Sequence, residues 1–337
     1  MKYSSAKDIQ KLIDNSHHIV IIQADNPDGD SLASSLALEQ ILHDLGKEPH
    51  MYCGVEMPSY LRYLPGWDRV EKEVPHKFDA SIIVDTSSRS LLESAEKAGY
   101  LAWIASKPVI IFDHHDVEET LGFNSIICNQ TEAVATGEVI YEIAQQLNWP
   151  LDIQAMNMLA ISILADSLGL MTSSTTARSI HIIAELVEKG VNLAELDDAR
   201  REMMRKSVEV TRYKGELLQR IEYHHNDRIA TITIPWSEIE KYSHNYNPSM
   251  LVIDEMRLTE NTEIAIAFKE YPQQRLTAKI RANYGKGIAD KLAEYFGGGG
   301  HPYASGFKVS NHRPYNEVKQ ECINKAIELL KQVDKDN

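Results

Sequence analysis

Three short apolar runs in the first third of the chain each lead into acidic residues. They are Ile19–Ile22, ahead of Asp28 and Asp30; Ser81–Val84, ahead of Asp85; and Val109–Phe112, ahead of Asp113, His114 and His115. Continuous apolar runs, unlike alternating ones, are typical of strands that are buried on both faces of a parallel sheet. Because ligands bind at the carboxyl ends of such strands, we expect these acidic ends to converge on one site.

Helical segments are predicted between and after these strands. Their composition and apolar spacing place them at residues 4–15, 31–42, 88–98, 133–147 and 153–165. Strands that alternate with helices over the first 130 residues predict an α/β domain in which helices flank a mostly parallel sheet. We assign residues 1–190 to this domain.

The second part of the chain has a different pattern. A charged, helix-forming stretch predicts a helical connector over 191–220, and it precedes strand-like runs at 229–234, 263–268 and 276–281. Polar residues alternate with apolar ones in these runs, which indicates a sheet with one wetter face. We therefore predict a smaller α/β domain with a mixed sheet over 221–337.

Composition narrows the class of protein. Apolar residues make up 43% and charged residues 25% of the 337 residues, as in ordinary soluble domains, and no apolar run is long enough to span a membrane. The net charge of −14 disfavours a protein that grips long duplex nucleic acid through its phosphates. Three scattered cysteines favour a reducing cytoplasm. The sequence leaves a homodimer open.

The converging acids indicate a metal centre. Carboxylates beside a neutral imidazole repel one another unless a cation lies among them, and oxygen-rich sites with one His suit Mn²⁺ or Mg²⁺. Asp28 and Asp30 lie on one turn, and Asp85 could bridge two ions about 3.5–4 Å apart. The alternative for Asp28 and Asp30 is helix capping, and Asp166 before Ser167 has the same alternative.

A run of four glycines, 297–300, precedes His301 near the end of the chain. Glycines are costly to order in a folded domain, but they let backbone amides approach an anion closely. We therefore predict that this segment approaches an anion. His301 could bind phosphate or satisfy a turn, and Arg281 could contact a phosphate, a nucleobase or only an acidic partner.

Together these motifs resemble the DHH phosphoesterase family, in the branch whose catalytic domain is followed by a DHH-associated substrate-binding domain. The resemblance covers nearly the whole chain. The residues that carry it are Asn26–Asp30, Val84–Asp85, Asp113–His115, Asp166, Gly297–His301 and Ala304–Gly306.

The resemblance implies two Mn²⁺ ions, with Mg²⁺ as the alternative cofactor, and assigns roles to matching residues. The implied metal ligands are Asp28, Asp30, Asp85, His114 and Asp166, and the implied catalytic residues are Asp85, His115 as a phosphate contact, and Asp113 as an orienting acid. The implied substrate-binding residues are Arg281, Gly298, Gly299, Gly300 and His301.

The implied activity is hydrolysis of short oligoribonucleotides or of 3′-phosphoadenosine-5′-phosphate (pAp), by metal-activated water in a cleft between the domains. Hydrolysis of cyclic or linear dinucleotides is an alternative, and so is a catalytically weakened nucleotide sensor. One departure motivates the sensor: Ala24 stands where the family pattern has a His, four residues before Asp28. Asp25 as a substitute ligand, a water molecule and a weak metal site are the open explanations.

Overall fold

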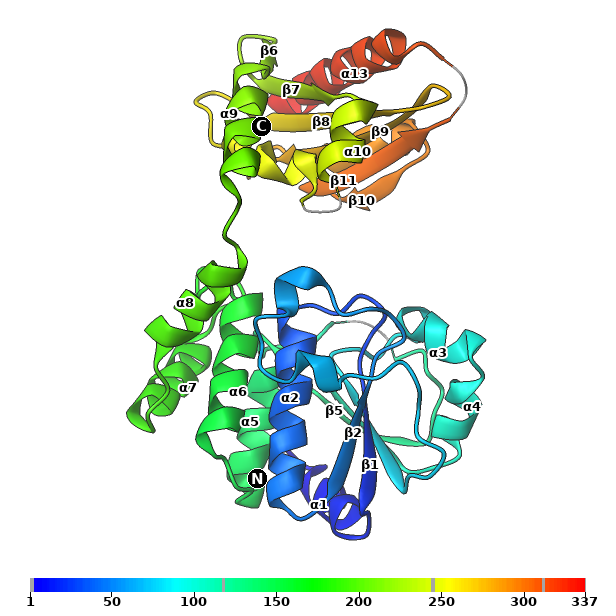
Figure 1. The fold of residues 1–337 in the computed structure, drawn as a ribbon, viewed down its shortest axis with the longest axis vertical. Helices are drawn as coiled ribbons and strands as arrows, with labels where there is room; N and C mark the ends of the chain where they lie inside the picture. Colours follow the sequence, from blue (N-terminus) through cyan, green and yellow to red (C-terminus); the bar gives the residue numbers. More distant parts are fainter. Residues whose placement is uncertain (1–2, 117–118, 244–245, 311–312, 337) are drawn as a thin grey trace. The chain divides into compact units, whose positions relative to one another are not determined.

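The structure is a computed structural model that describes residues 3–116, 119–243, 246–310 and 313–336 (Figure 1). It divides into two compact units, Met1–Arg205 and Lys206–Asn337. The boundary between them falls inside the stretch 191–220 that we predict to be a connector.

The first unit contains a five-stranded sheet in which every neighbouring pair is parallel, in the order β2-β1-β3-β4-β5. Its strands are β1 (His18–Ile22), β2 (Glu48–Tyr52), β3 (Ala80–Val84), β4 (Val109–Asp113) and β5 (Ser125–Asn129). The three central strands are the predicted apolar runs. The edge strands β2 and β5 were not predicted, because Pro49 and several half-exposed side chains interrupt the apolar pattern there.

Alternate residues of the central strands pack into two separate cores. Ile21, Ile82 and Phe112 belong to the core beneath the longer helices, whereas Ile22 and Ile83 belong to the core on the opposite face. The longer helices are α1 (Ala6–Asp14), α2 (Gly29–Asp44), α5 (Thr136–Leu147), α6 (Ile153–Asp166), α7 (Ala177–Glu188) and α8 (Leu193–Met203). The opposite face carries α3 (Glu93–Lys97) and α4 (Tyr100–Ala105).

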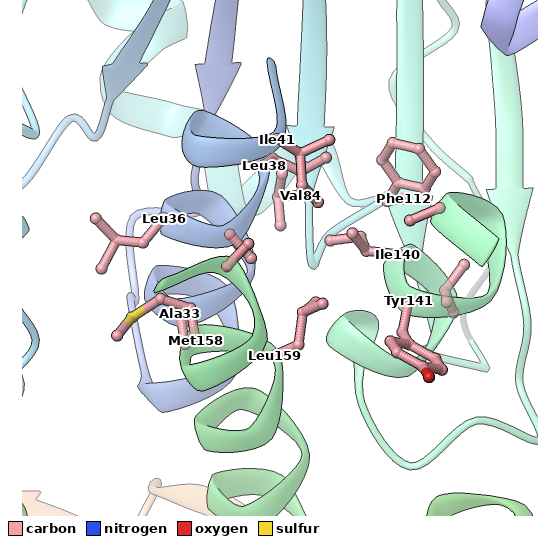
Figure 2. Close-up of a cluster of buried hydrophobic side chains, with 14 of the residues drawn as sticks. Ala33, Leu36, Leu38, Ile41, Val84, Phe112, Ile140, Tyr141, Met158 and Leu159 are labelled. Carbon is pink, nitrogen blue, oxygen red and sulfur yellow. The ribbon is translucent and has the colours of Figure 1, made fainter. Parts of the chain in front are cut away.

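The larger core joins α2, α5 and α6 to the sheet. Figure 2 shows Leu38 and Ile41 of α2 beside Val84 at the end of β3, with Leu159 of α6 and Ile140 of α5 nearby. Close packing of α2, α5 and α6 sets the positions of the loops at the strand ends.

Between β2 and β3 the chain forms two single 3₁₀ turns, η1 (Ser59–Leu61) and η2 (Trp67–Arg69).

Two helix predictions need correction. Residues 88–98 are not one helix: a 3₁₀ turn, η3 (Arg89–Leu92), precedes the short α3. The charged stretch after residue 193 forms two helices, α8 and α9 (Val208–Gln219), because Ser207 starts a new helix by accepting a hydrogen bond from the Val210 amide at 3.2 Å.

The second unit contains a six-stranded mixed sheet in the order β10-β11-β9-β8-β7-β6, in which only β7 and β8 pair in parallel among the described strands. Its strands are β6 (Glu222–His224), β7 (Ile229–Ile234), β8 (Ile264–Tyr271), β9 (Arg275–Ala282), β10 (Gly299–His301) and β11 (Ala304–Val309). The predicted α/β architecture with a parallel sheet followed by a mixed one is confirmed.

Helices cover both faces of this mixed sheet. On one face α12 (Ala289–Tyr295) and α13 (Tyr315–Asp336) pack against β9 and β11. On the other, α9, α10 (Trp236–Tyr242), η4 (Pro248–Leu251) and α11 (Ile253–Arg257) pack against β7 and β8. Among the helices in the described ranges, none combines the length and the apolar character needed to span a bilayer.

We predict that Leu159→Ala destabilises the first unit by about 2–5 kcal/mol, because it leaves a cavity where α6 packs against α2 and α5. Leu159 is 0% exposed, whereas Ile153 on the same helix is 44% exposed and is the matched control. Urea denaturation followed by circular dichroism measures both. An equal loss in Ile153→Ala would contradict this account of the core.

Candidate metal centre

The candidate site lies at the point in the first sheet where the strand order reverses. β1 has β2 on one side and β3 on the other, so the chain leaves β1 and β3 in opposite directions around the sheet. Asp28 and Asp30 follow β1, and Asp85 follows β3. The expected convergence of acidic strand ends therefore occurs here.

Asp30 is buried in the first turn of α2 and is only 1% exposed. Its carboxylate accepts hydrogen bonds from the hydroxyls of Ser34 at 2.8 Å and Ser162 at 2.5 Å, and from the Thr136 amide at 2.7 Å. These donors come from α2, α6 and α5. They hold the carboxylate in one orientation, and motif reasoning did not find them.

Position 137, beside these hydrogen bonds, has no room for a side chain. Its amide donates to the Ser162 hydroxyl at 3.0 Å, and a Cβ at this position would collide with that same hydroxyl. A side chain at 137 would displace the serine that orients Asp30.

Asp85 directly follows β3 and has a left-handed backbone conformation with φ +63°. Its amide donates to the Phe112 carbonyl at 2.9 Å, and its carboxylate accepts from the Thr136 hydroxyl at 2.9 Å. Burial, followed by the negative charges of Asp30 and Asp28, raises the pKa of Asp85 well above its usual value. A positive charge beside this carboxylate would stabilise its ionised form.

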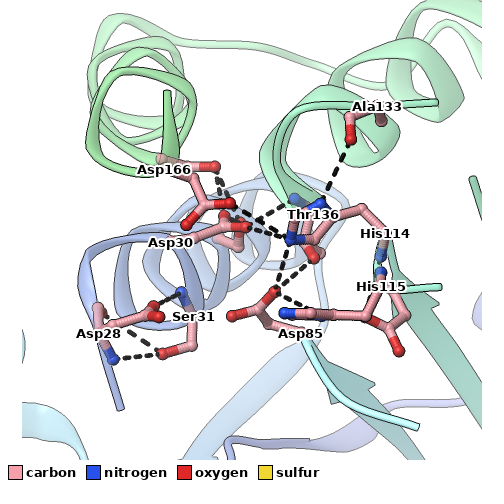
Figure 3. A network of polar contacts seen from close by, with 12 residues as sticks. Asp28, Asp30, Ser31, Asp85, His114, His115, Ala133, Thr136 and Asp166 are labelled. Atoms are coloured by element: carbon pink, nitrogen blue, oxygen red, sulfur yellow. Dashed lines mark hydrogen bonds and ion pairs between the residues drawn. The ribbon is translucent and has the colours of Figure 1, made fainter. Parts of the chain in front are cut away.

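His114 is the centre of the cluster (Figure 3). Its Nε2 lies 3.6 Å from carboxylate oxygens of Asp30 and Asp85 and 3.5 Å from one of Asp166. Its Nδ1 faces the Ala133 carbonyl at 3.3 Å, so a proton on Nδ1 leaves the Nε2 lone pair directed at the carboxylates. Burial and then Asp30 raise the pKa of Asp166 to about 6.

His115 and Asp113 form a hydrogen-bonded pair that adjoins this cluster, and His115 Nδ1 also lies 3.8 Å from an Asp85 carboxylate oxygen. Asp113 is buried and accepts from His115 Nδ1 at 2.9 Å, from the His114 amide at 2.9 Å and from the Ser87 hydroxyl. Burial alone would raise the pKa of Asp113, but the bonds from His115 and Ser87 lower it. The Asp113 hydrogen bond raises the pKa of His115, which is 48% exposed and can carry a proton toward solvent.

Asp28 caps a helix, which is the alternative role that we considered for it. Its carboxylate accepts from the Ser31 amide at 3.0 Å and caps α2, in a reciprocal capping box with the Ser31 hydroxyl. Figure 3 shows it turned toward Ser31. The negative charge of Asp28 raises the pKa values of Asp85 and Asp166. Among the described residues, two groups around His114 have ligand atoms within 4.8 Å of one another, and Asp28 belongs to neither group.

Asp25, the substitute ligand considered for the position of Ala24, is held by two hydrogen bonds. Its carboxylate accepts from the Ser94 amide at 2.7 Å, in the first turn of α3, and its own amide donates to the Leu91 carbonyl. Ala24 is buried, and its carbonyl accepts from Cys53 Sγ.

The donor set around His114 fits a divalent cation that prefers oxygen. The two compact groups are Asp30 with His114 and Asp166, and Asp85 with His114 and His115. Three carboxylates around one imidazole supply hard oxygen ligands. Burial, and then repulsion from Asp30, raises the pKa values of Asp85 and Asp166, and a cation would offset both effects. This arrangement can hold Mn²⁺ or Mg²⁺.

The residues predicted to bind substrate lie together in the second unit. His301 of β10 pairs with Ala304 of β11, which in turn pairs with Arg281 of β9. Paired residues of neighbouring strands share a face, so His301 and Arg281 lie on the same side of the sheet.

The three glycines that precede His301 differ in how much room each position leaves for a side chain. A Cβ on Gly298 would collide with the Gly306 carbonyl. Gly300 has φ +139°, and a Cβ there would lie 2.7 Å from the Ala304 carbonyl oxygen, whereas Gly299 faces open space. Close pairing of β10 with β11 therefore explains Gly298 and Gly300 without a bound anion.

Thr176 caps α7 by accepting a hydrogen bond from the Ser179 amide at 3.2 Å.

Comparison with known proteins matches residues 18–173 to the DHH family, N-terminal domain. The chain is 26% identical over 282 residues to a Thermus thermophilus protein named bifunctional oligoribonuclease and PAP phosphatase NrnA, across 83% of this chain and 81% of that protein. The match to the family model spans every residue of the two groups around His114.

Two solved structures share the fold. An exopolyphosphatase-related protein from Bacteroides fragilis is similar with a TM-score of 0.81 at 20% identity, across 97% of this chain and 98% of that one. RecJ of Thermus thermophilus, solved in complex with Mn²⁺, is similar with a TM-score of 0.53 at 14% identity, across 96% of this chain and 54% of that one. The predicted resemblance to the DHH family is confirmed.

We predict that Gly298→Ala destabilises the second unit by about 1–3 kcal/mol, because the new methyl group collides with the backbone of β11. Gly299→Ala is the matched control and should leave stability unchanged or slightly higher. Urea denaturation and hydrogen exchange of β9 and β11 amides measure both. Equal effects of the two substitutions would contradict the steric account.

Proposed function

We propose that the protein is a divalent-metal-dependent phosphoesterase acting on short oligoribonucleotides, on pAp, or on both, because its residues 18–173 match the DHH family, N-terminal domain. The observation that carries this proposal is the convergence of Asp30, Asp85 and Asp166 on His114 Nε2. The substrate class is supported by the name of the Thermus thermophilus relative.

We assign the metal ligands to Asp30, Asp85, His114 and Asp166, with Asp28 contributing from its cap position. The RecJ neighbour with bound Mn²⁺ supports that choice of ion. When bound, such ions supply positive charge against the phosphate and make water acidic enough to act as a nucleophile near neutral pH.

We assign a direct part in the reaction to two side chains, His115 and Asp113. When protonated, the exposed imidazole of His115 donates to a phosphoryl oxygen and offsets the charge that accumulates there as the bond to phosphorus breaks. Asp113 raises the pKa of His115 and orients its ring, and Ser87 holds Asp113 from its other side. Both residues are therefore assigned to the catalytic machinery.

The substrate-binding role belongs to the second unit in this proposal. Arg281 and His301 share a face of the mixed sheet, and we assign phosphate binding to them together with the backbone of Gly298, Gly299 and Gly300. At the Ala24 position we assign the missing ligand to water, because the Asp25 carboxylate is bonded to Ser94.

We predict that Mn²⁺ raises the melting temperature of the protein, since a ligand that binds only the folded state at 100 times its Kd adds about 2.7 kcal/mol. Asp85→Asn should lose most of this shift. Without metal, Asp85→Asn should melt above the wild type, because it removes a charge that burial and Asp30 disfavour.

Asp25→Asn is the matched control for that experiment, since an amide oxygen can still accept from Ser94. It should keep the Mn²⁺ shift. Scanning calorimetry with and without EDTA measures all three proteins, and a full shift in Asp85→Asn would overturn the ligand assignment.

We predict Mn²⁺-dependent turnover of at least one of pAp, pApA and a five-nucleotide RNA, with loss of turnover on adding EDTA. Asp85→Asn should reduce the rate by at least roughly 100-fold, as expected when transition-state charge loses its compensation. Chromatography of the nucleotide products measures this. Preference for pAp would indicate a phosphatase, and preference for the RNAs an oligoribonuclease.

Absence of turnover together with a normal Mn²⁺ shift would favour the second candidate, a nucleotide sensor. The observation behind that candidate is Ala24, a buried methyl group where the family pattern places a metal-binding imidazole. Restoring turnover with Ala24→His would then identify the missing ligand as the cause.

A further inference from the structure

Two histidines and a glutamate converge at the amino ends of β1 and β2. His17 directly precedes β1, His18 begins it, and Glu48 begins β2. His17 Nε2 lies 3.3 Å from Glu48 Oε1, and His18 Nδ1 lies 3.1 Å from Glu48 Oε2. One ligand atom from each of the three side chains lies within 4.8 Å of the other two. The cluster therefore brings two imidazole nitrogens and a carboxylate to one place.

Strand pairing fixes the backbone that carries this cluster. His18 and Glu48 are register partners in the parallel pair of β1 with β2, and the Glu48 amide donates to the His17 carbonyl at 2.8 Å. The amides of His17 and His18 both donate to Asp79 Oδ2, at 2.8 and 2.9 Å. These two hydrogen bonds lower the pKa of Asp79, so that an ionised carboxylate stays beside the histidines. The sheet therefore holds the three residues in position without help from their side chains.

Neither packing nor hydrogen bonding accounts for the approach of these side chains. They are 57%, 48% and 64% exposed, for His17, His18 and Glu48 in turn, so they lie outside the core. Within the ranges that the structure describes, none of the three side chains makes a hydrogen bond to another residue. An exposed ion pair contributes little to stability and gives little reason for two rings to face one carboxylate. Their ligand atoms are open to an ion from solvent.

The donor set and its spacing favour zinc. Imidazole nitrogens suit Zn²⁺, whereas Mn²⁺ and Mg²⁺ prefer oxygen. Zn²⁺ binds His nitrogen at about 2.0–2.1 Å and carboxylate oxygen at about 2.0–2.2 Å, usually in a tetrahedron, so two of its ligand atoms lie roughly 3.3–3.5 Å apart. The observed 3.3 and 3.1 Å are close to this spacing. Two His and one Glu, with water in the fourth position, form one of the ligand sets that zinc uses in proteins.

We propose that His17, His18 and Glu48 form a zinc site, with a water molecule as the fourth ligand. The site goes beyond the proposed function and is distinct from the candidate metal centre, because Asp85 and His114 follow the carboxyl ends of strands in the same sheet. β1 has five residues, a length of about 16 Å, which separates the two ends. Bound zinc joins the amino ends of β1 and β2 and stabilises the first unit without entering the reaction.

Zinc binding by the full chain tests the proposal. Equilibrium dialysis against Zn²⁺, with the bound metal measured by mass spectrometry, gives the stoichiometry and the affinity. His18→Ala should retain one Zn²⁺ fewer per chain than the wild type. His18→Ala and Glu48→Gln should each weaken binding at this site by at least roughly 100-fold, because residues that only orient a ligand already contribute 10- to 100-fold.

Two control variants show where the zinc binds. His43→Ala removes an exposed histidine whose Nδ1 lies 3.9 Å from an Asp44 carboxylate oxygen, outside any compact group of ligand atoms among the described residues, and should keep the full zinc content. Asp85→Asn changes the candidate metal centre and should keep the zinc that His18→Ala loses. Equal zinc content in wild type and His18→Ala, or loss of all zinc in Asp85→Asn, would overturn the proposal.

Thermal melting supplies a second readout that needs no turnover. Zn²⁺ should raise the melting temperature of Asp85→Asn, and adding His18→Ala to that variant should abolish the increase, since an ion that binds only the folded state stabilises it. An increase that persists in the double variant would also overturn the proposal. Because no substrate enters either measurement, an inactive protein would refute the proposed function and leave the zinc site standing.

Discussion

Repulsion among buried carboxylates is the constraint on which the first unit depends. Asp30 and Asp85 lie in the interior at the ends of neighbouring strands, and both approach the same imidazole nitrogen as Asp166. Such a cluster is unfavourable by itself, as the raised pKa values of Asp85 and Asp166 indicate. The fold tolerates it because helices packed on the sheet supply hydrogen-bond donors, and a divalent cation would complete the compensation.

The geometry of the site therefore depends on how the helices pack. Ser34, Thr136 and Ser162 come from three helices that meet over the sheet, and all three contact the carboxylates of Asp30 or Asp85. Gly137 lets α5 approach α6 closely enough for this contact. A change in the core between these helices would move the donors, so stability and ligand geometry are coupled in this unit.

In the second unit, some positively charged side chains form no ion pair among the described residues, although the protein as a whole is acidic. Lys279 and Arg281 remain without ion pairs among the residues described, whereas Arg228 and Lys286 are neutralised by Glu263 and Asp334. The glycine run permits close pairing of β10 and β11 at the edge of the same sheet. Within the described residues, this unit therefore combines a closely paired glycine edge with two cations that form no ion pair.

The sequence by itself determined the α/β class, the three central strands and the presence of acids at their ends, because continuous apolar runs specify burial locally. It did not reveal the edge strand β2, whose pattern is interrupted by Pro49, or the break at Ser207. Only the tertiary structure decided that Asp28 caps a helix while Asp30 turns inward, and that Ser162, 132 residues away, orients Asp30. Spacing along the chain limits where a side chain can reach, but its partners depend on which helices pack together, and that is set by the whole core.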